Sequence, residues 1–270
     1  MRRHFLASTL IVTVIGAATL APDGGFAQGG QLPQPPQGFQ EPPAPPPAPV
    51  KPYKPVAETP PAAYSDPSFA AFRKNLAEIA QGKDRAALAK DVVARGFFWV
   101  QDKNNADKTK SGIDNLAKAI GLDNPDGSGW DIIAAAADDP TLAELPQSNG
   151  AFCAPAPPQF DPQALQALIQ QTDTDPTDWG YASTAGADVR AAAQDNAQTV
   201  EKLGLYFVRV LADGPAASPG QPQFLHLALP DGKTGFVAAD AVNPLASDQI
   251  CYRKAAGGWQ IAGYIGGVQP

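Results

Sequence analysis

The sequence predicts an α+β fold, with a small helical N-terminal domain over residues 64–145 and a β-barrel over residues 186–270 that ends in an extra terminal hairpin. Two observations predict this fold. Apolar residues recur at helical spacing through the first region. Short β-rich runs follow at about ten-residue intervals in the second region, separated by glycine, proline and aspartate, as in a barrel or sandwich.

The N-terminus has the pattern of a signal peptide over residues 1–27. Arg2 and Arg3 form a basic start, residues 5–21 are apolar and uncharged, and residues 25–27 supply small side chains before a cut. An uncleaved anchor is the alternative, but the apolar core is slightly short for a span. The two arginines also resemble a twin-arginine export signal, although the general secretory route is favoured. We therefore expect a periplasmic or secreted protein, without a stable membrane span after cleavage.

Residues 28–63 are expected to form a disordered proline-rich linker. Thirteen of the 29 residues from 33 to 61 are proline, a composition that favours polyproline II over a buried core. At ~3.1 Å per residue such a segment could hold the folded part roughly 90 Å from a membrane or cell wall. Residues 46–51 and 49–54 also fit P-x-x-P-x-K, a polyproline ligand pattern that proline-rich sequence produces by chance as well.

The helical domain follows from its start and stop signals. A first helix begins after Asp66, a second begins at Asp84 and ends at Gly96, a third ends at Gly121, and a fourth covers residues 130–137. The side chains expected to face inward are Phe69, Phe72, Leu76, Ile79, Leu88, Val92, Val93, Ile113, Leu116 and Ile120.

The remaining elements are mainly loops and strands. The aromatic run over residues 97–100 is either a buried strand or a packed loop. Residues 146–185 are expected to be connecting loops with one short helix that begins at Asp161. Residues 230–233 are a tight turn with an Asp-Gly signal. The expected strands near the C-terminus are residues 205–211, 224–229, 234–237, 250–253 and 259–262.

Several short pieces of the second half carry a family resemblance. They are Asp188-Val189-Arg190-Ala191, residues 199–203, residues 207–211, and Asp231-Gly232-Lys233-Thr234-Gly235-Phe236-Val237 with the turn that follows. Residues 186–245 thereby resemble the bacterial SH3-like (SH3b) domains of exported and envelope proteins, although Ala192-Ala193 replaces the family's glycine-proline turn. The resemblance implies an SH3-like barrel that binds peptide or cell wall. It also implies strands over residues 188–203, where propensity alone favours a helix.

The two cysteines, Cys153 and Cys251, are expected to form a disulfide in an oxidising compartment. Closing a loop of about a hundred residues stabilises a fold by roughly 4–5 kcal/mol at most. The alternative is a pair of reactive thiols. A cysteine nucleophile needs a histidine base, and the chain after the leader keeps only His226.

No cofactor or metal is expected from the motifs. No cluster of histidine and cysteine has the spacing of a zinc site, and the glycines near the C-terminus lack the lysine of a phosphate-binding loop. Asp173, Asp175 and Asp178 could gather around calcium, but acidic loops are usually just solvated.

The expected function is a non-enzymatic binding or scaffold module in the bacterial envelope. Its expected partners are an envelope protein, a proline-rich peptide or peptidoglycan, while the net charge of −7 argues against nucleic acid. The candidate ligand contacts are Trp179, Tyr181 and Phe236. The sequence does not distinguish this function from a structural role within a larger envelope complex.

The alternative is an envelope hydrolase or accessory enzyme with its site in the helical domain. Such a site would need a cleft in which polar groups converge. The best candidates for it are Asp102, Asp107 and Asp114.

Overall fold

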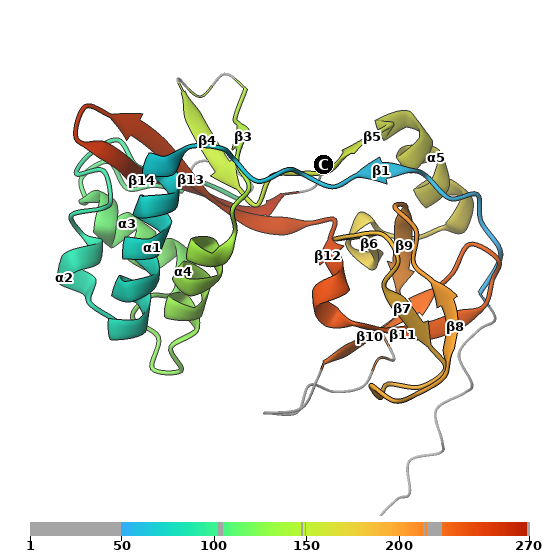
Figure 1. The fold of residues 1–270 in the computed structure, drawn as a ribbon. Helices are drawn as coiled ribbons and strands as arrows, with labels where there is room; N and C mark the ends of the chain where they lie inside the picture. Colours follow the sequence, from blue (N-terminus) through green and yellow to red (C-terminus); the bar gives the residue numbers. More distant parts are fainter. Residues whose placement is uncertain are drawn as a thin grey trace, which may run out of the picture. The chain divides into compact units, whose positions relative to one another are not determined.

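The computed structural model describes residues 50–101, 105–146, 148, 150–212, 214 and 223–268. The expected signal peptide, the linker up to residue 49 and Asp102 lie outside the described residues. The described part is α+β, as predicted (Figure 1). Its buried apolar side chains form separate hydrophobic cores. No described helix is long and apolar enough to cross a membrane.

Four helices and one sheet form what we call the helical lobe. The helices are α1 (Pro67–Gly82), α2 (Arg85–Leu88), α3 (Gly112–Ile120) and α4 (Ser128–Asp138). The predicted end signals at Asp66 and Gly121 are confirmed, since the Asp66 side chain accepts from the Ser68 amide at the start of α1 and Gly121 ends α3 in the left-handed region. The predicted end at Gly96 is wrong, since α2 ends at Leu88. The second helix is shorter than expected, because Val92 forms a β-bridge with Ile261 instead.

The sheet of the helical lobe has the order β2-β14-β13-β4-β3. Its strands are β2 (Phe98–Val100), β3 (Ala143–Glu144), β4 (Ala151–Ala154), β13 (Ser247–Ala255) and β14 (Gly258–Val268). β2 and β14 run parallel, and the other neighbours are antiparallel. The hairpin β13–β14 shares one core with the helices, as the burial of Phe69, Leu76, Tyr252 and Ile261 shows.

The C-terminal hairpin therefore belongs to the helical lobe, which corrects our expectation that it extends the barrel. The Trp259 indole N–H donates to Ser68 Oγ at 3.0 Å, and Lys254 Nζ lies 2.7 Å from Asp66 Oδ2. Both partners stand at the start of α1. The aromatic face of the hairpin packs on helices that are far from it in the sequence, so local patterns could not predict this contact.

The Cys153–Cys251 disulfide is present as predicted, with an S–S distance of 2.05 Å. The two residues face each other across the adjacent strands β4 and β13, and both are buried. The chain between these strands, residues 155–246, leaves the helical sheet at β4 and returns to it at β13. The disulfide thus links the strand that precedes residues 155–246 to the strand that follows them.

Residues 155–246 form what we call the β-lobe, on which residues 50–59 pack, and its main sheet has the order β12-β6-β9-β10-β11-β7-β8. Its strands are β6 (Trp179–Ala182), β7 (Asp188–Arg190), β8 (Thr199–Lys202), β9 (Phe207–Val210), β10 (Phe224–Ala228), β11 (Thr234–Ala238) and β12 (Val242–Pro244). The other elements are α5 (Pro162–Thr172), the single turns η1 (Pro176–Asp178) and η2 (Ala239–Ala241), and the pair β1 (Glu58–Thr59) and β5 (Gln159–Phe160).

The main sheet contains strands where local propensity favoured a helix. β7 and β8 pair antiparallel, and Val189 on β7 is fully buried with Leu227 and Val237 in the core of this sheet. Tertiary burial therefore outweighs the helical propensity of the alanine-rich stretch. The pairing among the described strands is open, with β12 and β8 as its outer members, and no closed barrel is formed by these strands.

Residues 50–63, expected within a disordered linker, are folded onto the protein. Residues 50–59, which we call the strap, include β1, and Ala63 forms a β-bridge with Thr141. The linker prediction is wrong for this part, because composition is an average over the segment. Tyr53 and Val56 bury enough apolar surface for the strap to dock, with exposed fractions of 6% and 8%.

Loss of the disulfide should lower stability markedly. The alanine pair C153A/C251A should have a free energy of unfolding lower by up to about 4–5 kcal/mol, because 98 residues separate the cysteines and the crosslink restricts the unfolded chain. Urea denaturation measures the change. The reduced wild-type protein is the matched control and should show a similar loss. Equal stability of the reduced and oxidised proteins would contradict the prediction.

Candidate functional site

The strap turns one side toward the β-lobe, and its spacing explains which residues are buried. Polyproline II repeats every three residues, so positions 53 and 56 share one side. A strand repeats every two residues, so position 58 joins them. Tyr53, Val56 and Glu58 are accordingly buried, whereas Lys51 and Lys54 are exposed.

Main-chain hydrogen bonds join the strap to the β-lobe. The pairs are the Tyr53 N–H with the Pro230 carbonyl (3.0 Å), the Glu58 N–H with the Leu205 carbonyl (3.2 Å) and the Phe207 N–H with the Val56 carbonyl (3.1 Å). Polyproline II has no internal hydrogen bonds, so these backbone groups are free to pair with a neighbour. Such pairing suits any extended peptide, and side-chain pockets then select among sequences.

Tyr53 is the anchor of the strap. Its hydroxyl donates to the Ala228 carbonyl at 3.0 Å, and its ring meets the Trp179 ring edge to face at a centroid distance of 5.2 Å. Burial raises the pKa of Tyr53, so the hydroxyl keeps its proton and remains a donor. The pocket around it also contains Phe207 and Leu165. A tyrosine with a satisfied hydroxyl in an aromatic pocket is typical of a recognition contact.

The turn after β10 lets the strap approach closely. Gly232 has a φ of +86°, which glycine adopts without strain. A Cβ at this position would lie 3.1 Å from the Val50 carbonyl oxygen and 3.1 Å from Pro52 Cγ. The Asp-Gly turn of the sequence therefore makes the strand connection and also leaves space for the strap.

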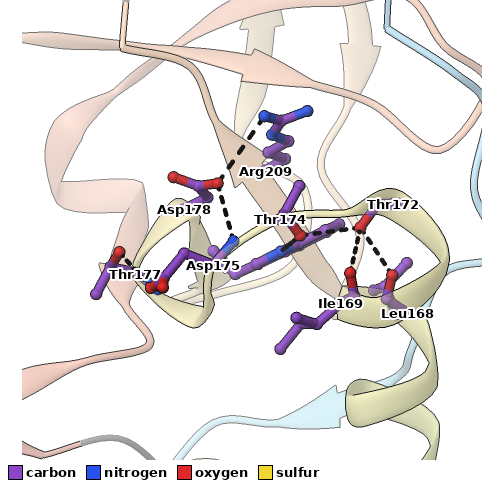
Figure 2. A network of polar contacts seen from close by, with 9 residues as sticks. Leu168, Ile169, Thr172, Thr174, Asp175, Thr177, Asp178 and Arg209 are labelled. Carbon is purple, nitrogen blue, oxygen red and sulfur yellow. Dashed lines mark hydrogen bonds and ion pairs between the residues drawn. The ribbon is translucent and has the colours of Figure 1, made fainter.

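A polar network in the loop before β6 holds the Trp179 indole, and Figure 2 shows the Thr172, Thr174, Asp175 and Asp178 side chains of this loop. The Trp179 indole N–H donates to Thr174 Oγ1 at 2.8 Å, and Thr174 and Thr172 share a hydrogen bond at 2.9 Å. Asp175 and Asp178 form a capping box around the turn η1. The loop thus holds the indole in one orientation through a chain of short-range bonds.

The three aromatic candidates have different surroundings. Trp179 and Tyr181 share the core beneath the strap and are 1% and 4% exposed, so this structure gives a ligand no direct access to them. Phe236 lies apart from them, half-buried, with its ring stacked on His226 at 4.5 Å. Trp179 is thus a support for the strap pocket, and Phe236 belongs to another part of the sheet.

Sequence reasoning missed the residues that build this site. Tyr53 and Val56 stood in the expected linker, and Pro230 and Leu205 contribute only backbone atoms. One signal was available, since two bulky apolar residues three positions apart in a proline-rich segment mark one side of a polyproline helix. The second P-x-x-P-x-K match, residues 49–54, contains Tyr53, and the first lies mostly outside the described residues.

Two of the three carboxylates proposed for a hydrolase, Asp107 and Asp114, line a polar hollow of about 650 Å³ in the helical lobe. Hydrogen bonds from the Thr109 side chain and amide lower the pKa of Asp107. The Ser111 hydroxyl, followed by the Arg85 guanidinium, lowers the pKa of Asp114. These contacts favour the ionised forms of Asp107 and Asp114.

The acidic loop before β6 has a structural role. Asp173 ends α5 in the left-handed region, and Asp175 and Asp178 cap η1. No group of three or more candidate ligand side chains gathers anywhere in the described chain, so the three aspartates do not assemble around one point.

Searches with family models, curated proteins and solved structures found no match to this chain. The function is therefore inferred from the contacts of the strap and the β-lobe.

Removing the acceptor of the Trp179 indole should destabilise the protein. The variant T174V should lose about 1–3 kcal/mol of unfolding free energy, because it leaves a buried N–H without a partner. Thermal or urea denaturation measures the loss. The matched control T177V removes an exposed hydroxyl of the same loop and should cost less than about 1 kcal/mol. Equal losses in the two variants would contradict this role of Thr174.

Proposed function

We propose that this protein is an exported, non-enzymatic binding module of the bacterial envelope, and that its β-lobe binds extended proline-containing peptides. The observation that carries the proposal is the strap itself. A proline-rich segment of this chain lies on the β-lobe through main-chain hydrogen bonds and a buried tyrosine, which is the way that a bound peptide would be held.

Other features support a binding role within an SH3-like (SH3b) fold. The strands β7, β8, β9 and β11 correspond to the segments on which the resemblance is based, and the Asp-Gly turn beside the strap is its most specific motif. The disulfide fits an oxidising compartment such as the periplasm. An envelope protein with a proline-rich segment is the partner class favoured by these contacts, ahead of peptidoglycan.

The site has no catalytic arrangement in the described residues. Its side chains are mainly aromatic and aliphatic, and its hydrogen bonds to the strap come largely from backbone atoms. Such a surface recognises the shape and free backbone of a peptide, but it offers no nucleophile with a nearby base.

The variant Y53A tests the peptide site. Removing Tyr53 should weaken docking of the strap and free the pocket, so a fluorescent peptide of residues 48–60 should bind at least about tenfold tighter to Y53A than to wild type. Fluorescence anisotropy of the purified, oxidised protein measures this. Y53F, which keeps the ring, should lie between the two, and Y64A, a tyrosine truncation in the helical lobe, should match wild type.

Two outcomes would overturn the proposal. In the first, Y53A fails to bind the peptide at any concentration while it keeps the circular dichroism of the wild type. In the second, the protein is retained on purified sacculi but binds no proline-containing peptide, which would assign the β-lobe to a cell-wall ligand instead.

A further inference from the structure

Glu58 is a buried acidic residue of the strap. It faces inward with Tyr53 and Val56, and it is 5% exposed. Neither of its carboxylate oxygens has a hydrogen-bond partner among the described residues. An unpaired carboxylate buried in this way is unfavourable, whereas the neutral acid is tolerated at much lower cost.

The surroundings of Glu58 offer little to stabilise its charge. Its strand partner is Phe160 of β5, and α5 contains no charged residue. The titratable or charged groups on the elements around it include Tyr181 of β6, Glu201 of β8, Tyr206, Arg209 of β9, Asp139 and Asp161. The cations are Arg209, which pairs with Asp178 at 3.9 Å, and Lys51 and Lys54 of the strap itself, which are exposed to solvent. The remaining groups are neutral or negative, so they do not favour a negative Glu58.

The direction of the pH effect follows from this environment. Burial raises the pKa of Glu58 from its ordinary value of 4.5 to about 7. The docked strap therefore binds this proton more tightly than the undocked strap. Docking is strongest below about pH 4.5 and weakens as the pH rises through about 7.

Few backbone contacts hold the strap on the β-lobe, so a change in the charge of Glu58 can shift the equilibrium between its docked and undocked forms. Its pairing consists of the two residues of β1 with β5 and one antiparallel β-bridge between Ala57 and Tyr206, together with a single hydrogen bond from the Tyr53 N–H. Segments with few backbone bonds open locally at a fraction of the global unfolding free energy. A change at one buried side chain can therefore shift the fraction of molecules with an open strap.

We propose that the strap is an internal competitor for the peptide site, and that loss of the proton from Glu58 loosens it, so that partner peptides gain access as the pH rises. This inference rests on the proposed function. The tethered strap and a free peptide compete for the same backbone groups, and the tether gives the strap a high effective concentration. Deprotonation of Glu58 lowers that advantage without altering the pocket around Tyr53.

Hydrogen exchange of the strap amides tests the loosening directly. Wild type and E58Q are compared at the same pH, which cancels the intrinsic pH dependence of exchange. At pH 8 the Tyr53 and Glu58 amides of wild type should exchange at least about tenfold faster than the same amides of E58Q, and the ratio should shrink several-fold by pH 5. The control E78Q removes an exposed carboxylate from α1 and should behave as wild type.

A peptide of residues 48–60 with glutamine at position 58 tests access to the site, since it carries no titrating group of its own there. It should bind wild type about tenfold tighter at pH 8 than at pH 5.5, and Y53A about equally at both. If Y53A binds the peptide but neither exchange nor wild-type affinity depends on Glu58, the gating is overturned and the proposed function stands. If exchange responds as expected but no variant binds the peptide, the peptide site itself is overturned.

Discussion

The pairing of β4 with β13, fastened by the Cys153–Cys251 disulfide, is the constraint on which the rest of the structure depends. It brings together two strands from opposite sides of a long stretch of sequence and makes the C-terminal hairpin part of the helical core. It also makes the β-lobe an insertion whose two connections begin at neighbouring strands. The β-lobe can then fold around its own cores while both of its ends remain fixed.

The strap shows how a proline-rich segment can become part of a fold. Proline removes backbone donors, so the regular pairing of the strap is confined to residues 57–59, after its last proline, and the part before them makes isolated hydrogen bonds. Tyr53 compensates by burying an aromatic ring and satisfying its hydroxyl at a strand carbonyl. The few contacts of the strap are the basis of our proposals that it can be displaced and that the surface beneath it binds peptides.

Charge has two roles in this protein. At the surface, aspartates such as Asp66 and Asp114 accept hydrogen bonds at helix starts and meet nearby cations, which favours their ionised forms and stabilises local structure. Inside the β-lobe, Glu58 has no such partner in the described chain, and its ionised form is disfavoured. Asp66 and Asp114 therefore stabilise local structure in their ionised forms, whereas Glu58 is the carboxylate whose protonation we propose to control docking of the strap.

The sequence by itself determined the features that depend on neighbouring residues. These are the α+β class, the helix ends at Asp66 and Gly121, the tight turn that contains Gly232, and the pairing of the two cysteines. Tertiary structure alone decided where the hairpin packs, that Trp179 and Tyr181 are buried, and that Tyr53 docks on the β-lobe. The reason is distance along the chain: Trp259 and Ser68 bond across 191 residues, and Tyr53 and Ala228 across 175. Local patterns determine helix ends and turns, but the surface that a segment covers is formed by residues far from it in the sequence, and burial overrides the helical propensity of residues 188–203.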